Sequence, residues 1–263
     1  MFHATAMVAD YDATLEPLAR LFGFRVLHDN VVPDEGIGRR GGMTWIGDGS
    51  VEIGEPVGSR SPVRRFVETF GGGMHSVALQ VEDIRAAKAH LVAHDAGVAS
   101  EPYEGMVWTR PGDTAGVLLE WYSLVQEDDP RRGAPVPNGP PPVVPVERLA
   151  FVSAEVDSPD DAAARIATLT RTPSQALEGC GDLVAAVSLV DCTLALKRRT
   201  GPRPRMHGVG LLVGSLDAAE SALHDEGVRV AQRWDHLLLL DETALPFPIY
   251  LCNCLLPGDP RNS

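Results

Sequence analysis

The chain has 263 residues, of which 44% are hydrophobic and 22% are charged. This length allows two ordinary domains, and the composition is that of a globular protein rather than a disordered one. A formal charge of −13 opposes binding to a polyanion, so we expect no nucleic-acid partner. The first residues lack the features of a signal peptide, and no apolar run reaches the roughly 20 residues that span a bilayer. We therefore expect a cytoplasmic protein without a membrane partner.

Residues 1–125 show one order of signals twice, over residues 1–53 and again over residues 73–123. Each time an alternating apolar strand is followed by a helical run and by strands that glycine-rich turns separate. Residues 126–147 are polar and rich in proline, which predicts a linker, because proline interrupts both helices and central strands. Residues 148–258 repeat the same order. The pattern predicts an α+β fold of four β-α-β-β-β modules.

The repeat is clearest in two segments, GMHSVALQVEDIRAAKAHLVAHDAGV from Gly73 and RMHGVGLLVGSLDAAESALHDEGVRV from Arg205. Both contain Met-His, alternate through a strand, start a helix near an aspartate and end it at a glycine. In the other two modules, Asp10 is expected to correspond to Asp157. Such length and order indicate related modules rather than chance similarity.

Four modules of this kind, with a histidine early in the first strand and a glutamate late in the last, resemble the vicinal oxygen chelate superfamily. That superfamily includes glyoxalase I, methylmalonyl-CoA epimerase, extradiol dioxygenases and bleomycin-resistance proteins. The segments SPVRRFVETFGGGMHSVALQVEDI and TRPGDTAGVLLEWY are most similar to the epimerases. The resemblance covers about residues 1–123, and only the module pattern persists over residues 146–258. It implies tandem domains with two open, cup-shaped mixed β-sheets.

Four side chains in the first half, His3, Glu52, His75 and Glu120, fall at the superfamily's metal-ligand positions. Alternation along a strand would aim each of them at one face of its sheet, so that all four can converge in one cup. Glu55 is a competing candidate, but its offset of three residues from Glu52 points it to the other face. Two imidazoles and two carboxylates suit a divalent ion such as Zn, Ni, Co, Mn or Fe(II).

The second half retains one of the four candidate ligands, His207, which corresponds to His75. The other three positions are expected to hold residues that do not bind metals, namely Ala150, Thr193 or Leu194, and a residue near Leu251. We therefore expect residues 148–258 to be a degenerate copy of the first domain. This disfavours an extradiol dioxygenase, because those two-domain relatives keep iron in the C-terminal pair of modules.

A metal with open positions polarises a carbonyl and stabilises the enolate that forms when a neighbouring C–H loses its proton. Glu120 and Glu52 are the candidates for the catalytic acid and base, which would make the chain an epimerase or isomerase. The expected substrate is a small carbonyl compound, such as an acyl-CoA, a keto-sugar or a secondary metabolite. Arg39, Arg40 and Arg64 are candidates for binding an anionic group of that substrate.

Two other functions remain open: a metal-dependent lyase or dioxygenase, and a metal-free ligand-binding protein of the bleomycin-resistance type. A homodimer is also consistent with the resemblance. No second acid or base outside the ligand set can be matched to the epimerase pattern, although Asp34 and Glu35 precede the third strand. The remaining histidines, His28 among them, are predicted to be surface residues, and Trp108 is predicted to belong to the core.

Overall fold

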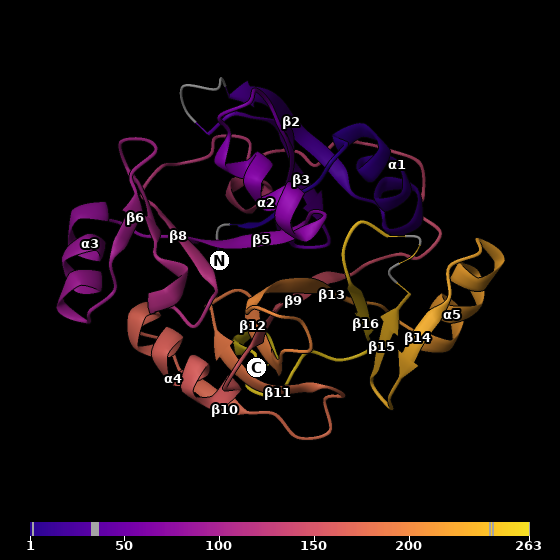
Figure 1. Cartoon of the computed structure of the whole chain (residues 1–263). Helices are drawn as coiled ribbons and strands as arrows, with labels where there is room; N and C mark the ends of the chain where they lie inside the picture. Colours follow the sequence, from indigo (N-terminus) through magenta and orange to yellow (C-terminus); the bar gives the residue numbers. More distant parts are fainter. Residues whose placement is uncertain (2, 33–36, 242, 244, 263) are drawn as a thin grey trace.

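The computed structural model describes residues 1, 3–32, 37–241, 243 and 245–262. They form two eight-stranded mixed β-sheets, one from each half of the chain (Figure 1). The strand order is β2-β3-β4-β1-β5-β8-β7-β6 in the first sheet and β10-β11-β12-β9-β13-β16-β15-β14 in the second. The two orders are the same once the labels are shifted by eight. The predicted α+β fold of four modules in two open sheets is confirmed.

The first half contains eight strands, three α-helices and a 3₁₀ turn at Pro111–Asp113. Their order is β1 (His3–Met7), α1 (Tyr11–Phe22), β2 (Arg25–Val32), β3 (Arg39–Ile46), β4 (Gly49–Pro56), α2 (Pro62–Phe70), β5 (Gly73–Gln80), α3 (Ile84–Ala93), β6 (Val98–Ser100), β7 (Met106–Thr109) and β8 (Leu118–Tyr122). Helices α1 and α3 belong to the two modules, and α2 connects them.

The second half repeats this order, and its described residues 199–204, between β12 and β13, contain no counterpart of α2. Its elements are β9 (Arg148–Val156), α4 (Pro159–Thr170), β10 (Ser174–Ala176), β11 (Leu183–Ser188), β12 (Thr193–Arg198), β13 (Arg205–Leu212), α5 (Leu216–Asp225), β14 (Val230–Arg233), β15 (Leu237–Leu240) and β16 (Ile249–Cys252). Among the described residues, no helix combines the length and apolarity needed to cross a membrane.

Local sequence signals explain where the module helices begin. The Asp10 side chain accepts a hydrogen bond from the backbone N–H of Ala13, which caps α1, and Gly23 ends that helix in a left-handed conformation, φ 84°. In the third module the residue before the helix is Ser158. Asp10 therefore corresponds to Ser158, and the expected match with Asp157 is wrong by one residue.

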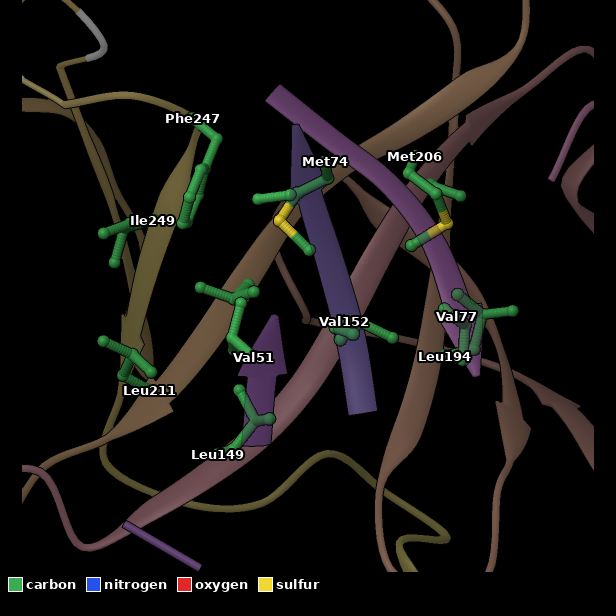
Figure 2. Close-up of a cluster of buried hydrophobic side chains, with 14 of the residues drawn as sticks. Val51, Met74, Val77, Leu149, Val152, Leu194, Met206, Leu211, Phe247 and Ile249 are labelled. Atoms are coloured by element: carbon green, nitrogen blue, oxygen red, sulfur yellow. The ribbon is translucent and has the colours of Figure 1, made fainter. Parts of the chain in front are cut away.

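One apolar core joins the two sheets. Side chains that alternate with the candidate ligands, such as Ala4 and Val51, face away from the cup. They pack against α1, α3 and side chains of the second half, including Val152 and Leu194. Figure 2 shows residues of both halves gathered in this core. The concave sides of the sheets therefore lie away from the surface through which the halves are joined.

The turn between β3 and β4 docks against the start of β9. The Asp48 carboxylate accepts a hydrogen bond of 3.0 Å from the backbone N–H of Leu149 and lies 2.9 Å from the guanidinium of Arg148. Gly47 has a φ of +59°, and a Cβ at this position would be 2.6 Å from the Cα of Arg148. Close approach of the two halves thus requires glycine at the turn.

Residues 126–147 contain a 3₁₀ turn at Pro130–Arg132 and no strand. This segment is tied to the first half, because the backbone N–H groups of Val143 and Val144 donate to the carbonyls of Arg20 and Leu21 at 3.1 and 2.8 Å. The segment also begins at the edge of the cup, where Gln126 lines a cavity. It is therefore packed against the first half along part of its length.

Candidate functional site

A cavity of about 270 Å³ occupies the concave side of the first sheet. The four predicted ligands, His3, Glu52, His75 and Glu120, all line it. The strand register explains this for three of them: Glu52 pairs with Thr5 of β1, while Ala78 of β5 pairs with both His3 and Glu120. His75 lies at a register shift in β5, between Met74, which pairs with Ala6, and Ser76, which pairs with Thr5. Side chains two strands apart in one row of the sheet share a face. The cup thus brings both carboxylates and both imidazoles to one space.

The carboxylate of Glu52 has a partner on each of its two oxygens. Arg39 forms an ion pair with one carboxylate oxygen, and Nε2 of His3 lies 3.5 Å from the other. Burial alone would raise the pKa of Glu52, but Arg39 and then His3 outweigh it and hold the pKa at about 2. Glu52 is therefore an anion throughout the physiological range and a weak proton acceptor.

Glu120 is held by neutral donors instead. The hydroxyl of Ser76 donates to Oε1, and the hydroxyl of Tyr122 donates to Oε2 at 3.0 Å. Nδ1 of His75 lies 4.0 Å from Oε1. Burial, helped by the negative charge of Glu52, raises the pKa of Glu120 above its ordinary value. The pKa values of the two carboxyl groups are thus shifted in opposite directions, and Glu120 is the better proton acceptor of the two.

His75 is suited to metal binding in its neutral form. Its side chain is 13% exposed, and burial lowers its pKa to about 4. The ring packs edge-on against Phe66 of α2 and faces Trp108 of β7, with centroid distances of 4.8 and 6.4 Å. A neutral imidazole held by aromatic neighbours can offer a ring nitrogen to a cation.

The donor set fits a divalent ion in type and in pairwise spacing. Two ligands that each lie about 2.1 Å from one ion are about 3 to 4 Å apart, as the His3–Glu52 and His75–Glu120 pairs are. However, the His3–Glu52 pair and the His75–Glu120 pair do not form one coordination site in this arrangement. Among the described residues, no three His, Cys, Asp or Glu side chains are arranged so that they could hold a metal ion as they stand. Shared coordination would require Glu52 to move from Arg39 and Glu120 to give up a hydrogen bond.

The three candidate arginines lie in different places. Arg39 lines the cavity. Arg40, the next residue in β3, points to the opposite face, where it pairs with Asp12 and Glu55. Arg64 in α2 donates to the carbonyl of Gly58 at 2.8 Å and does not line the cavity. Of the three, Arg39 is the one that lines the cavity, and its role toward a substrate stays a prediction. Glu55, as expected, does not face the cup.

Several residues of the cavity are not predicted from the sequence, among them His28, Trp108 and Tyr122. His28 lines the cavity and bonds through Nδ1 to Asp128, although it was expected on the surface. Trp108 lines the cavity as well and is not confined to the core. Tyr122 was not singled out, although its position two residues after Glu120 in the same strand was a usable signal. Asp34 and Glu35 lie outside the described residues.

The second sheet shows which residues replace the ligands. Gly210 occupies the place of Ala78 in the repeated Met-His segment, and it pairs with Phe151 and with Tyr250. Phe151 therefore corresponds to His3, where Ala150 was expected, and Tyr250 corresponds to Glu120, next to the expected neighbourhood of Leu251.

The third replacement follows from the strand next to β9. Ser153 corresponds to Thr5, and its partner in β12 is Ala195. Ala195 therefore replaces Glu52, and the expected match with Thr193 or Leu194 is wrong. His207 still corresponds to His75. The second sheet has kept one of the four candidate ligands.

Comparison with known proteins agrees with the family resemblance of the first half of the chain. A family model described as the glyoxalase/bleomycin resistance protein/dioxygenase superfamily matches residues 2–109. The mitochondrial methylmalonyl-CoA epimerase of Bos taurus is 25% identical over 126 residues, which are 45% of this chain and 70% of that protein. The ethylmalonyl-CoA/methylmalonyl-CoA epimerase of Cereibacter sphaeroides is 29% identical over 126 residues, with 45% and 92% covered.

Both halves of the fold are matched by a variant of 4-hydroxymandelate synthase from Streptomyces coelicolor. The TM-score is 0.67, and the match covers 100% of this chain and 95% of that chain. At 16% identity this likeness shows the fold alone. The match of residues 2–109 to the family model, in contrast, is a similarity of sequence. A domain of the glyoxalase/bleomycin resistance protein/dioxygenase superfamily is therefore recognised over residues 2–109 of the chain.

Proposed function

We propose that the N-terminal half is a metal-dependent epimerase or isomerase that removes a proton alpha to a carbonyl group. The observation that carries the proposal is the cavity in which His3, Glu52, His75 and Glu120 meet. It lies in the part of the chain that is similar to two epimerases of acyl-CoA compounds. A small carbonyl compound, with an acyl-CoA as the first to test, is the substrate that this similarity favours.

His3, Glu52, His75 and Glu120 are the residues that would hold the divalent ion, for which Zn, Ni, Co, Mn and Fe(II) remain candidates. Such an ion, when bound, polarises a carbonyl oxygen and stabilises negative charge that develops on it. The permanent charge of Glu52 supports cation binding. Its ion pair with Arg39 must open first, which leaves Arg39 available to an anionic group of the substrate.

Glu120 is the proposed base. Its raised pKa brings proton transfer closer to neutral pH, and the Ser76 and Tyr122 hydroxyls fix the orientation of its carboxylate. Glu52 takes the electrostatic role, since its pKa of about 2 makes it a poor proton acceptor. Ile37, Val63 and Trp108 add apolar surface to the cavity, which strengthens the electrostatic interactions inside it.

Exchange of the alpha proton of methylmalonyl-CoA in heavy water tests this function. The wild-type chain supplied with a divalent metal is expected to incorporate deuterium. Replacing Glu120 by glutamine should slow incorporation by roughly 10²–10⁴-fold, the usual contribution of a general base. Glu55→Gln is the matched control, because Glu55 lies on the opposite face of the first sheet. Undiminished exchange in Glu120→Gln would remove Glu120 from this role.

One observation favours a second candidate, a metal-free ligand-binding protein. Both buried carboxylates already have partners within the chain: Arg39 and His3 for Glu52, and Ser76 and Tyr122 for Glu120. A cavity neutralised in this way can bind a polar small molecule without an ion. This candidate predicts ligand binding that is unchanged by chelators, together with no proton exchange at any metal concentration.

A further inference from the structure

His28 enters the cavity because β2 contains a bulge. Val26 pairs with Thr44 of β3 and His28 pairs with Met43, so that two residues of β2 face one residue of β3. A shift by one residue transfers a side chain to the other face of a sheet. The bulge at Leu27 thus puts His28 in one row with Met43 and Glu52, which are partners in β3 and β4. All three side chains of this row line the cavity.

Asp128 determines how the His28 ring is oriented. Its carboxylate bonds to Nδ1 of His28 from a position 100 residues further along the chain. Asp128 belongs to residues 126–147, and Gln126 of the same segment also lines the cavity. A carboxylate on Nδ1 stabilises the tautomer that carries its proton there. Nε2 is then the ring nitrogen left to accept a proton from a bound molecule.

His28 and Glu120 stand on different walls of the cup. β2 is one edge strand of the first sheet, and β3, β4, β1 and β5 separate it from β8, which carries Glu120. Because the sheet curves around one cavity that both side chains line, a molecule bound between them presents different sides to each. Glu52 is a poorer candidate for the second wall, since Arg39 and His3 already engage its carboxylate.

We propose that the His28–Asp128 pair is the second acid–base group of this cavity and works opposite Glu120. Glu120 accepts the alpha proton from one side of the substrate, and protonated His28 donates a proton from Nε2 to the same carbon from the other side. Glu120 gains one proton and His28 loses one, so the substrate is inverted without net change. Both groups return to their starting forms by exchange with water, which reaches the 40% exposed side chain of His28.

This inference rests on the proposed function and deepens it by assigning inversion, rather than transfer to a neighbouring carbon, to the site. The chain provides an internal comparison in a second His–Asp pair, which lies outside the cavity. Nδ1 of His224 lies 3.8 Å from Asp225, and the two side chains are 83% and 82% exposed on α5, outside the cavity. His28 differs from His224 because it lines the cavity and because its partner, Asp128, lies 100 residues away in the chain.

The tautomer of His28 provides the first test and needs no substrate. Long-range ¹⁵N NMR spectra of the whole protein, assigned by loss of signals in His28→Gln, are expected to show neutral His28 protonated on Nδ1. Asp128→Asn should reduce that preference, whereas Asp225→Asn should leave His28 unchanged. A His28 protonated on Nε2 in the wild type would overturn the proposal.

The second test separates inversion from proton removal, with single enantiomers of methylmalonyl-CoA in heavy water as the probe. His28→Gln is expected to slow inversion at least 100-fold while exchange through Glu120 continues for one enantiomer, and His224→Gln should match the wild type. Inversion by His28→Gln at the wild-type rate would overturn the proposal. Absence of exchange in the wild type would instead count against the proposed function, and the tautomer result would then decide the His28–Asp128 arrangement alone.

Discussion

The two sheets share one strand order but differ in what fills their concave sides. The first encloses a cavity lined by His3, Glu52, His75 and Glu120. In the second, aromatic and apolar side chains fill the corresponding space, and the rings of Phe151 and Tyr250 pack with centroids 5.5 Å apart.

Three replacements account for this difference. Phe151, Ala195 and Tyr250 replace a histidine and two glutamates, and all three belong to one buried cluster. The same backbone can therefore support a polar cavity or a closed core, depending on a few positions. Function must be argued from those positions and not from the fold.

The largest effect expected from this comparison is a loss of stability on substitution of Phe151, which fills the concave side of the second sheet. Phe151 is fully buried, so Phe151→Ala should lower the free energy of unfolding by about 3–5 kcal/mol, the usual cost of deleting a core aromatic ring. His3→Ala at the corresponding position borders a cavity and should cost less. Denaturant unfolding of both variants measures the difference. Equal losses would contradict the distinction between a filled and an open cup.

A smaller loss of stability is expected on substitution of Gly210, which leaves space for the ring of Phe151. A Cβ on Gly210 would lie 2.1 Å from the Phe151 ring, while the corresponding residue of the first sheet is Ala78. Gly210→Ala should therefore destabilise the chain by about 1–3 kcal/mol through overpacking. In a double-mutant cycle the cost should shrink when Phe151 is also alanine. A cost that stays the same in both backgrounds would show that the ring is not the cause.

His207, the candidate ligand kept in the second sheet, should make the stability of the chain depend on pH. Burial, followed by the charges of Lys197 and Arg205, lowers the pKa of His207 from 6.5 to about 3. Between these values the unfolded chain binds a proton that the folded chain does not. Stability should therefore fall with decreasing pH, by up to about 1.4 kcal/mol per pH unit from this group.

His207→Gln removes this contribution, so its stability should fall less steeply than that of the wild type across the same pH window. Urea unfolding from neutral pH downwards measures both slopes. The exposed His224→Gln variant is the control and should retain the wild-type slope. Identical slopes in all three proteins would exclude His207 as the cause.

Much of this comparison could be predicted from the sequence. Alternation placed His3, Glu52 and Glu120 on one face, and the repeated Met-His segments identified His207 as the counterpart of His75. These signals are local, because each depends on spacing within one strand or one module. Glu55 was excluded from the cup for the same reason.

The errors arose where pairing between distant strands decides the outcome. Matching Asp10 with Asp157 was wrong by one residue, and the same offset led from His3 to Ala150 where the structure has Phe151. The bulge in β2 turned His28 into the cavity, and its partner Asp128 lies 100 residues away. No local pattern carries this information, because a single inserted residue reverses the face on which a side chain lies.

Metal binding tests the central claim of the comparison most directly. Calorimetric titration of the metal-stripped protein with Zn²⁺ and with Mn²⁺ is predicted to show one bound ion per chain for at least one of the two metals. Glu52→Gln should weaken that binding by about 100-fold or more, whereas Glu55→Gln, on the opposite face of the same strand, should leave it within a few-fold. A wild-type chain that binds neither ion, or a Glu52→Gln variant that binds as tightly as the wild type, would contradict the account.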